Sequence, residues 1–298
     1  MAQSSGVLPR AQASELTPTW RRQSRSRVIT ATLRYVVLTM VSLLFAAPFL
    51  WMVLTSLKTT HAVFEVPPTL VPTRVQWSNY PTALTQIPFL LYLWNTLVIA
   101  VSGTVGALFC SALVGYSFGR IDWWGRRWLF PLVLASMMLP FQVKMVPTFL
   151  IFTWLHWVGT FLPLIVPSFI NVPLFIFLMR QFYLTLPKEL PDAARVDGAG
   201  EWRVFWEVML PLTKPALASV AIFSFLGHWN DFLAPLIYLT NPNDFTLSVG
   251  LQAFQGTHAT EWALLMAAAT VFALPVIILF FSLQRFFVRG IAATGLKG

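Results

Sequence analysis

Charged residues are scarce in this chain, and their scarcity excludes a whole class of proteins. Only 10% of the 298 residues are Asp, Glu, Lys or Arg, whereas 57% are hydrophobic. A soluble globular domain has about 25% charged residues. The composition therefore excludes a soluble globule and indicates an integral membrane protein.

Cysteine and histidine are also rare. The single cysteine, Cys110, lies in an apolar run and cannot form an internal disulfide. The four histidines are far apart without metal-ligand spacing, and no serine or cysteine has a catalytic context. The phosphate-loop pattern G-x-x-x-x-G-K-[ST] is missing, since Gly290 to Gly295 is followed by Leu296. We therefore predict a protein that is not an enzyme and that binds no metal, ATP or other cofactor itself.

What the chain does have is long apolar segments. Six of them can cross about 30 Å of hydrocarbon at about 1.5 Å per residue. Prolines interrupt the third and fourth, so we expect kinks there. The predicted spans are residues 35–57, 91–118, 128–150, 161–179, 212–238 and 262–288.

Basic residues give the orientation. With a cytoplasmic N-terminus, seventeen of the twenty Lys and Arg residues fall on the inner side, only Lys58 and Arg74 fall outside, and Lys144 lies within the third span. The net charge of +9 is thus explained by topology and does not indicate a nucleic-acid partner. We predict a cytoplasmic tail over 1–32, a membrane domain over 33–288 with a cytoplasmic loop at 180–214, and a cytoplasmic tail over 289–298.

The cytoplasmic loop reads as two short helices. The first begins near Pro191, with Asp192 at the positive end of the helix dipole, and Gly198 supplies a left-handed cap. The second pairs Arg203 with Glu207 and ends at Pro211. Its apolar face carries residues at i, i+3, i+4 and i+7, which are Trp202, Phe205, Trp206 and Met209.

Helices of two turns need a docking partner to be stable. The partner is the bilayer surface, the rest of this chain or another protein. An interfacial helix usually carries Lys or Arg along its polar face. This loop is acidic instead, with Asp192, Asp197, Glu201 and Glu207 against Arg195 and Arg203, so the bilayer surface is the poorest of the three.

The spacing of the loop resembles a known motif. An acidic-Ala-Ala triplet is followed by three residues, Gly, nine residues, an aliphatic residue, one residue and Leu-Pro. The matching residues are Asp192, Ala193, Ala194, Gly198, Val208, Leu210 and Pro211. This pattern resembles the EAA loop of binding-protein-dependent ABC importer permeases. Asp192 replaces the usual Glu and Val208 the usual Ile, and both changes keep the chemical character.

Further segments resemble the carbohydrate branch of these permeases. Residues 228–236 read HWNDFLAPL, similar to that branch's WNDFLWPL segment. Residues 284–290 and the ending Leu296-Lys297-Gly298 resemble the tail of the maltose-type G subunit. The resemblance covers the chain from about Tyr35 to Gly298.

The resemblance implies a fold and an assembly. The fold is all-α, the type I ABC importer permease (MetI-like) fold, with six transmembrane helices and both termini in the cytoplasm. The partners are a homologous second permease, two copies of a cytoplasmic ATPase that bind ATP and Mg, and an extracytoplasmic solute-binding protein, all at a bacterial inner membrane. Import of a sugar or oligosaccharide would proceed by alternating access.

The resemblance also assigns residues. The loop becomes the coupling helix seated in the ATPase, with contacts from Asp192, Ala193, Ala194, Asp197, Gly198, Trp202 and Phe205. The tail residues Leu296, Lys297 and Gly298 would reach the ATPase dimer interface.

Polar residues in or near the spans are candidates for the solute path, because polar groups in lipid are costly and should face protein or water. They are Asn95, Gln142, Asn171, Asn230 and Asp231. Structural hydrogen bonding between helices is the alternative for each. Two alternative functions also stay open, a permease for a non-sugar solute such as glycerol phosphate or an amino acid, and a stand-alone secondary transporter or channel.

Overall fold

The structure, a computed structural model, describes residues 19–256 and 260–295 and is helical in almost every element. The chain divides into two compact units, Met1–Trp51 and Met52–Gly298. Helix α1 (Thr19–Ser56), most of which belongs to the first unit, provides an apolar segment long enough to span a membrane. The remaining helices belong to the second unit, which holds the site discussed below.

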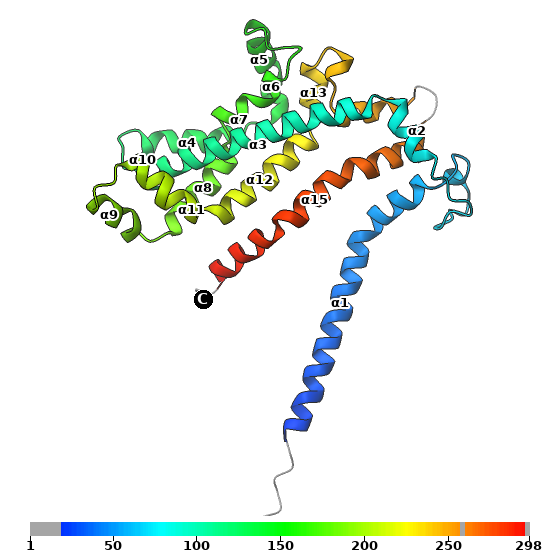
Figure 1. The fold of residues 1–298 in the computed structure, drawn as a ribbon, viewed down its shortest axis with the longest axis horizontal. Helices are drawn as coiled ribbons and strands as arrows, with labels where there is room; N and C mark the ends of the chain where they lie inside the picture. Colours follow the sequence, from blue (N-terminus) through cyan, green and yellow to red (C-terminus); the bar gives the residue numbers. More distant parts are fainter. Residues whose placement is uncertain (1–18, 257–259, 296–298) are drawn as a thin grey trace, which may run out of the picture. The chain divides into compact units, whose positions relative to one another are not determined.

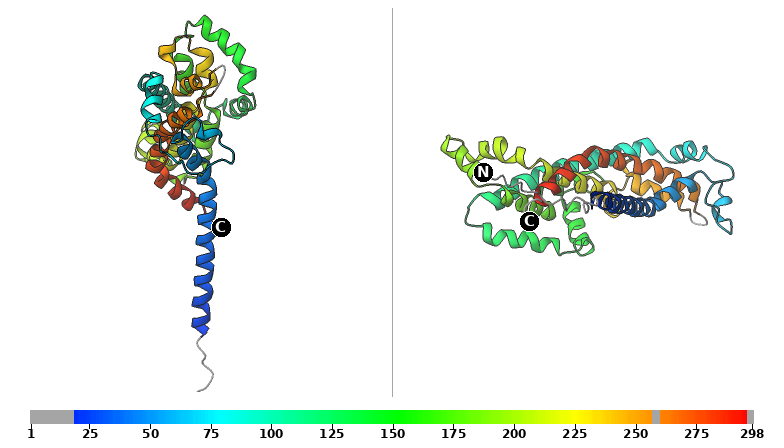
Figure 2. Two further views of the ribbon diagram at one scale, coloured as in Figure 1. Left: turned by 90° about the vertical axis from the view of Figure 1, so that its right-hand side faces the viewer. Right: turned by 90° about the horizontal axis from the view of Figure 1, so that it is seen from below.

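Three long helices organise the second unit. Helix α3 (Phe89–Arg120) packs against α8 (Pro173–Thr185) and α12 (Lys214–Trp229), and α12 packs in turn against α15 (Trp262–Gly295). Figure 1 shows α3, α12 and α15 running in the same general direction. Helices α4 (Arg126–Met137) and α5 (Phe141–Trp154) lie to one side of them in Figure 2.

Shorter elements connect these helices. Five of them are short helices: α2 (Asn79–Gln86), α6 (Leu162–Ile165), α7 (Pro167–Ile170), α13 (Leu233–Tyr238) and α14 (Leu247–Gly250). Three 3₁₀ turns cover Ala62–Phe64, Pro242–Asp244 and Leu251–Phe254. The loop between α8 and α12 contains α9 (Glu189–Val196), α10 (Glu201–Arg203), a π-helical segment (Val204–Met209) and α11 (Leu210–Leu212).

All six predicted spans are found as helical segments. Four are long apolar stretches, at Thr30–Ser56, Phe89–Arg120, Leu162–Thr185 and Trp262–Ser282. The other two are bent pairs, Arg126–Met137 with Phe141–Trp154 at 105° and Glu201–Leu212 with Lys214–Trp229 at 77°. In the second pair only Lys214–Trp229 falls in the predicted fifth span, and Glu201–Leu212 falls in the predicted cytoplasmic loop. The described residues therefore contain six spans when each bent pair counts as one.

The predicted boundaries need correction at the breaks. The span placed at 128–150 is interrupted before Pro140, which precedes α5 and has extended backbone angles (φ −62°, ψ 151°). Because Pro140 has no N–H and its backbone is extended, the hydrogen bonds of α4 cannot continue through it into α5. The span placed at 212–238 is also too long, because α12 ends at Trp229 and α13 is a separate short helix.

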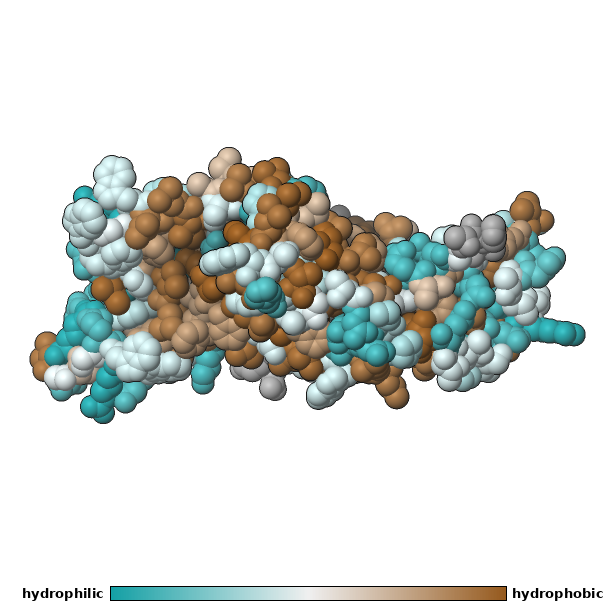
Figure 3. All heavy atoms as spheres, turned by 90° about the horizontal axis from the view of Figure 1, so that it is seen from above, coloured by the Kyte–Doolittle hydropathy of each residue, from teal (hydrophilic) through white to brown (hydrophobic). Residues whose placement is uncertain are grey.

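Buried side chains form a core at each end of α3. One core surrounds Trp229 and Tyr92 between α3, α12 and α15, and the other surrounds Tyr116, Met179 and Tyr183 between α3 and α8. In Figure 3, apolar side chains cover the middle of the visible face and hydrophilic ones gather toward both ends. That distribution suits a unit whose middle lies in hydrocarbon and whose ends meet water.

Candidate functional site at the loop between α8 and α12

Close packing of α3 on α8 sets the position from which the loop leaves the membrane helices. A Cβ atom added at Gly115 of α3 would lie 2.7 Å from Met179 Cβ and 3.1 Å from the Arg180 backbone nitrogen. One turn further along, a Cβ at Gly119 would lie 3.2 Å from Tyr183 Cβ. Only glycine permits this approach of the two backbones. The end of α8 is thereby held directly against the end of α3.

Arg120, the last residue of α3, fixes the start of the loop. Its Nε and Nη2 donate hydrogen bonds to the Tyr183 carbonyl oxygen at 2.8 and 2.5 Å, and Nη2 also donates to the Leu186 carbonyl. Both carbonyls lie at the C-terminal end of α8, where carbonyls lack donors from a following helical turn, and the Tyr183 carbonyl also accepts from the Leu186 amide at 3.3 Å. One guanidinium thus caps α8 and ties it to α3.

The first loop helix, α9, is held by a chain of polar contacts. Arg195 donates to Asp192 Oδ1 and to Glu201 Oε1, each at 2.6 Å, and Tyr116 Oη donates to Glu201 Oε2 at 3.1 Å. The hydrogen bond from Arg195 lowers the pKa of the Glu201 carboxyl, and the same contact raises the pKa of Arg195. Asp192 therefore meets its first basic partner within this chain.

Gly198 ends α9 as the sequence predicts. Its φ of +84° lies in the left-handed region that side chains with a Cβ rarely adopt. The amide of Ala199 donates back to Ala194 O at 2.9 Å and that of Asp197 to Ala193 O at 3.0 Å. This arrangement is the expected glycine cap, and it turns the chain into α10.

The second loop helix differs from the prediction in two ways. Its middle is a π-helix, in which the Leu210 amide donates five residues back to the Phe205 carbonyl. Pro211 does not end the helix, which continues to Leu212. The π-helical segment ends at Met209, just before Pro211, which has no backbone N–H to donate. The helix breaks two residues after Pro211, at Thr213.

The π turn changes which side chains face inward. Val204, Phe205 and Met209 are fully buried, and the Phe205 ring lies 5.2 Å from that of Tyr116. Trp202 is 64% exposed and Trp206 43% exposed. Of the four residues on the predicted apolar face, Phe205 and Met209 are therefore buried against the chain, whereas Trp202 and Trp206 contact the Phe205 ring at 6.0 and 5.2 Å and stay exposed.

The outer surface of the loop is apolar at several points. Val196, in the last turn of α9, is 87% exposed, and Leu190 is 41% exposed. Trp202 follows on α10, with its ring 5.9 Å from that of Trp206. We call Leu190, Val196 and Trp202 the outer patch, because all three are exposed apolar side chains of α9 and α10.

The remaining coupling candidates lie on or beside this surface. Asp192, Ala193, Asp197 and Gly198 are exposed, and Ala194 is half-buried against the core below. The pair between Arg203 and Glu207 is present, with Nε to Oε2 at 2.9 Å. Leu296, Lys297 and Gly298 lie outside the described residues.

The solute-path candidates differ in their surroundings. Asn95 is buried and donates to the carbonyls of Asn243 and Phe245 at 2.8 and 3.1 Å. Asp231 accepts from the Ala234 amide at the start of α13, at 3.2 Å. Gln142, Asn171 and Asn230 are exposed, and no hydrogen bond among the described residues joins two of the five. The hydrogen bonds of Asn95 and Asp231 fit the structural alternative, and a solute path along the five residues stays a prediction.

A polar contact between spans was missed by the sequence reading. His228 of α12 lies with Nε2 3.0 Å from the Ser168 hydroxyl of α7 and Nδ1 2.7 Å from the Ser224 carbonyl. The sequence signal was an ionisable residue inside an apolar span, which is a functional candidate by default. Among residues 19–256 and 260–295, no cluster of His, Cys, Asp and Glu could hold a metal ion.

Comparison with known proteins agrees with the fold. Residues 111–293 match the family described as binding-protein-dependent transport system inner membrane component. The chain is 36% identical over 263 residues to the arabinooligosaccharides transport system permease protein AraQ of Bacillus subtilis (strain 168), covering 87% of this chain and 93% of that protein. It is 30% identical over 259 residues to the diacetylchitobiose uptake system permease protein NgcG of Streptomyces coelicolor, covering 86% and 85%.

A solved structure shares the fold. The crystal structure of a bacterial ABC transporter involved in the import of the acidic polysaccharide alginate contains a chain that aligns with a TM-score of 0.74 at 24% identity, covering 88% of this chain and 98% of that one. The chain described here belongs to the family of binding-protein-dependent transport system inner membrane components, and is a membrane-spanning permease subunit rather than an enzyme.

Proposed function

We propose that this chain is the permease subunit of an ATP-driven importer for a sugar or oligosaccharide in a bacterial inner membrane. The relatives named for arabinooligosaccharides and diacetylchitobiose support a carbohydrate cargo. The segment HWNDFLAPL at 228–236 supports it independently. A homologous second permease, two copies of a cytoplasmic ATPase and an external solute-binding protein would complete the assembly.

One observation carries the proposal that the loop receives force from the ATPase. Its inner side is anchored by Phe205, Met209 and the contact of Tyr116 with Glu201, while its outer patch is exposed and apolar. Exposed apolar surface rimmed by charges is typical of a protein-binding site. Asp192, Ala193, Asp197 and Gly198 lie beside the patch, so we assign this whole surface to the ATPase contact. The tail residues Leu296, Lys297 and Gly298 would form a second contact.

The anchoring explains how movement of the loop would reach the solute path. Arg120 joins the loop entry to α3 and α8, and Phe205 packs on Tyr116 of α3. Packed cores transmit displacement because they deform little. When the ATPase dimer binds ATP with Mg and closes, the loop would pull α3, α8 and α12 together, and alternating access follows. This chain itself would bind no nucleotide.

The experiment replaces Val196 with Asp. Val196 is 87% exposed, so the substitution should leave the fold intact. An unpaired carboxylate in the ATPase interface costs several kcal/mol, and each 1.4 kcal/mol is about tenfold in affinity. Co-purified ATPase should therefore fall by at least about tenfold, and substrate-stimulated ATP hydrolysis should disappear.

Val71→Asp is the matched control. It is the same change at a residue that is 70% exposed in the segment between α1 and α2, outside the loop. Co-purification of ATPase should be unchanged there. Equal co-purification with both variants would show that the outer patch is not the contact.

A further inference from the structure

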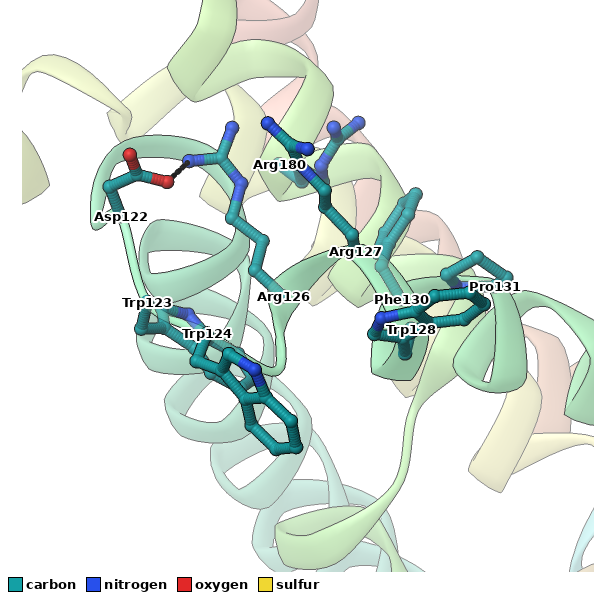
Figure 4. A pocket seen from close by; sticks show the side chains of 9 residues that line it. All are labelled: Asp122, Trp123, Trp124, Arg126, Arg127, Trp128, Phe130, Pro131 and Arg180. Atoms are coloured by element: carbon teal, nitrogen blue, oxygen red, sulfur yellow. Dashed lines mark ion pairs between the residues drawn. The ribbon is translucent and has the colours of Figure 1, made fainter.

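A hollow lies where the connection from α3 to α4 meets α8. Its volume is about 720 Å³, within the range of about 300–1,000 Å³ typical of small-molecule sites. Figure 4 shows the guanidinium groups of Arg126, Arg127 and Arg180 gathered toward one end, with aromatic rings along the sides. The hollow is separate from the outer patch.

The positive charge in this hollow is only partly compensated. Arg126 Nη1 is 3.6 Å from Asp122 Oδ1, and the Asp122 side chain is fully exposed to solvent. Arg180 donates from Nε to the Phe118 carbonyl at 3.2 Å and lies 4.1 Å above the Phe130 ring. Arg127 forms no ion pair or side-chain hydrogen bond with any other described residue. Three arginines thus face one carboxylate, so the hollow suits an anionic group.

The surroundings indicate that this anion carries acyl chains. Trp124 and Trp128 are 94% and 75% exposed, and exposed tryptophans of this kind mark the level of lipid headgroups. Just beyond the arginines along α4, Leu129 and Leu132 are 46% and 63% exposed. A headgroup in the hollow would therefore place its chains along α4. A free phosphate would make no use of these apolar side chains.

The hollow is also close to the coupling loop. A neighbouring cavity of about 430 Å³ shares Asp122, Arg126 and Arg127 with it and reaches Asp192 and Arg195 of α9. Arg120, which caps α8, lines that second cavity. A bound headgroup would therefore lie beside the loop entry.

We propose that Arg126, Arg127 and Arg180, with Trp124 and Trp128, form a binding site for the phosphate headgroup of an anionic phospholipid in the cytoplasmic leaflet. Basic pockets between membrane helices on the cytoplasmic side bind such headgroups through the same combination of charge and position. The phosphate oxygens would accept hydrogen bonds from the guanidinium groups, and the indoles would fix the depth.

The test measures lipid binding to the full-length purified chain by native mass spectrometry. The probes are phosphatidylglycerol, zwitterionic phosphatidylcholine and inorganic phosphate. Phosphatidylglycerol should bind more tightly than phosphatidylcholine, and inorganic phosphate alone should not bind measurably. Arg127→Gln should weaken phosphatidylglycerol binding about fivefold, and Arg126→Gln with Arg127→Gln about thirtyfold.

Arg203→Gln is the matched control, because it removes the same charge from the same side of the chain. Arg203 pairs with Glu207, away from the hollow, so phosphatidylglycerol binding should be unchanged. Trp124→Ala provides a second variant at a side chain that is 94% exposed and dispensable for folding, and it should also weaken binding. The proposal is overturned by equal binding of the two lipids, by an equal effect of Arg203→Gln and Arg127→Gln, or by inorganic phosphate binding as tightly as the lipid.

Discussion

Replacing Gly115 with Ala should push α3 away from α8. Because the loop is anchored where these two helices meet, the anchor should loosen as well. The added Cβ would lie 2.7 Å from Met179 Cβ, 3.1 Å from Arg180 N and 3.3 Å from Ile176 O. These atoms belong to the backbone of α8 or lie next to it, so no side-chain rotation can make room. One helix has to move away from the other.

The size of the effect follows from two opposing contributions. Overpacking in a well-packed core costs about 1–3 kcal/mol. Alanine in a helix is more favourable than glycine by about 1 kcal/mol. Gly227→Ala in α12 gives the second contribution alone, because nothing lies within 4 Å of a Cβ at Gly227. The difference between the two variants isolates the overpacking of α3 on α8, which should be about 1–3 kcal/mol.

The assay is thermal unfolding of both variants in one detergent. At about 2 °C per kcal/mol, the Tm of Gly115→Ala should lie about 2–6 °C below that of Gly227→Ala. If the two Tm values coincide, or if Gly115→Ala is the more stable variant, the close packing of α3 on α8 does not exist in the folded protein.

Three further predictions concern the loop and its orientation. Gly198→Val should abolish transport while the protein still inserts, because φ is +84° at this residue. Gly200→Val is the control: φ is −70° there and the free space is equal, so this variant should transport normally. Similar transport by both variants would contradict the glycine cap. Glu201→Gln removes the ion pair with Arg195, which lowers the pKa of Glu201. The stabilisation from this pair is present above the usual glutamate pKa of about 4.3 and is lost as pH falls through the lowered value. The difference in Tm between wild type and variant should therefore be constant from pH 8 to 5 and shrink at lower pH. In a Cys110→Ser background, a cysteine at Asp197 should resist an impermeant thiol reagent added to whole cells and one at Gln252 should react, and labelling of both would contradict the predicted topology.

Local rules predicted the parts of the site that depend on local structure. Gly198 has the positive φ that a helix cap requires, and Arg203 pairs with Glu207 four residues on. The six apolar segments are present because length and hydropathy alone decide whether a helix can cross hydrocarbon.

Features set by packing between distant segments were not predictable in this way. The π turn at Val204–Met209 depends on how Phe205 and Met209 dock on α3 and α8, and a periodicity of 3.6 does not reveal that Trp202 and Trp206 stay exposed while Phe205 and Met209 are buried. The role of Arg120 is not visible in the sequence, since its acceptors lie more than sixty residues away, at Tyr183 and Leu186. The contact of Tyr116 with Glu201 crosses a similar distance in sequence.

The central claim is that the outer patch of α9 and α10 contacts the ATPase, and photo-cross-linking tests it most directly. A benzophenone amino acid replaces Val196 in one variant and Val71 in the other, in cells that co-express the complete importer. We expect a cross-link between this chain and the ATPase from position 196 and none from position 71. No ATPase adduct from position 196, or equal adducts from both positions, would contradict the account.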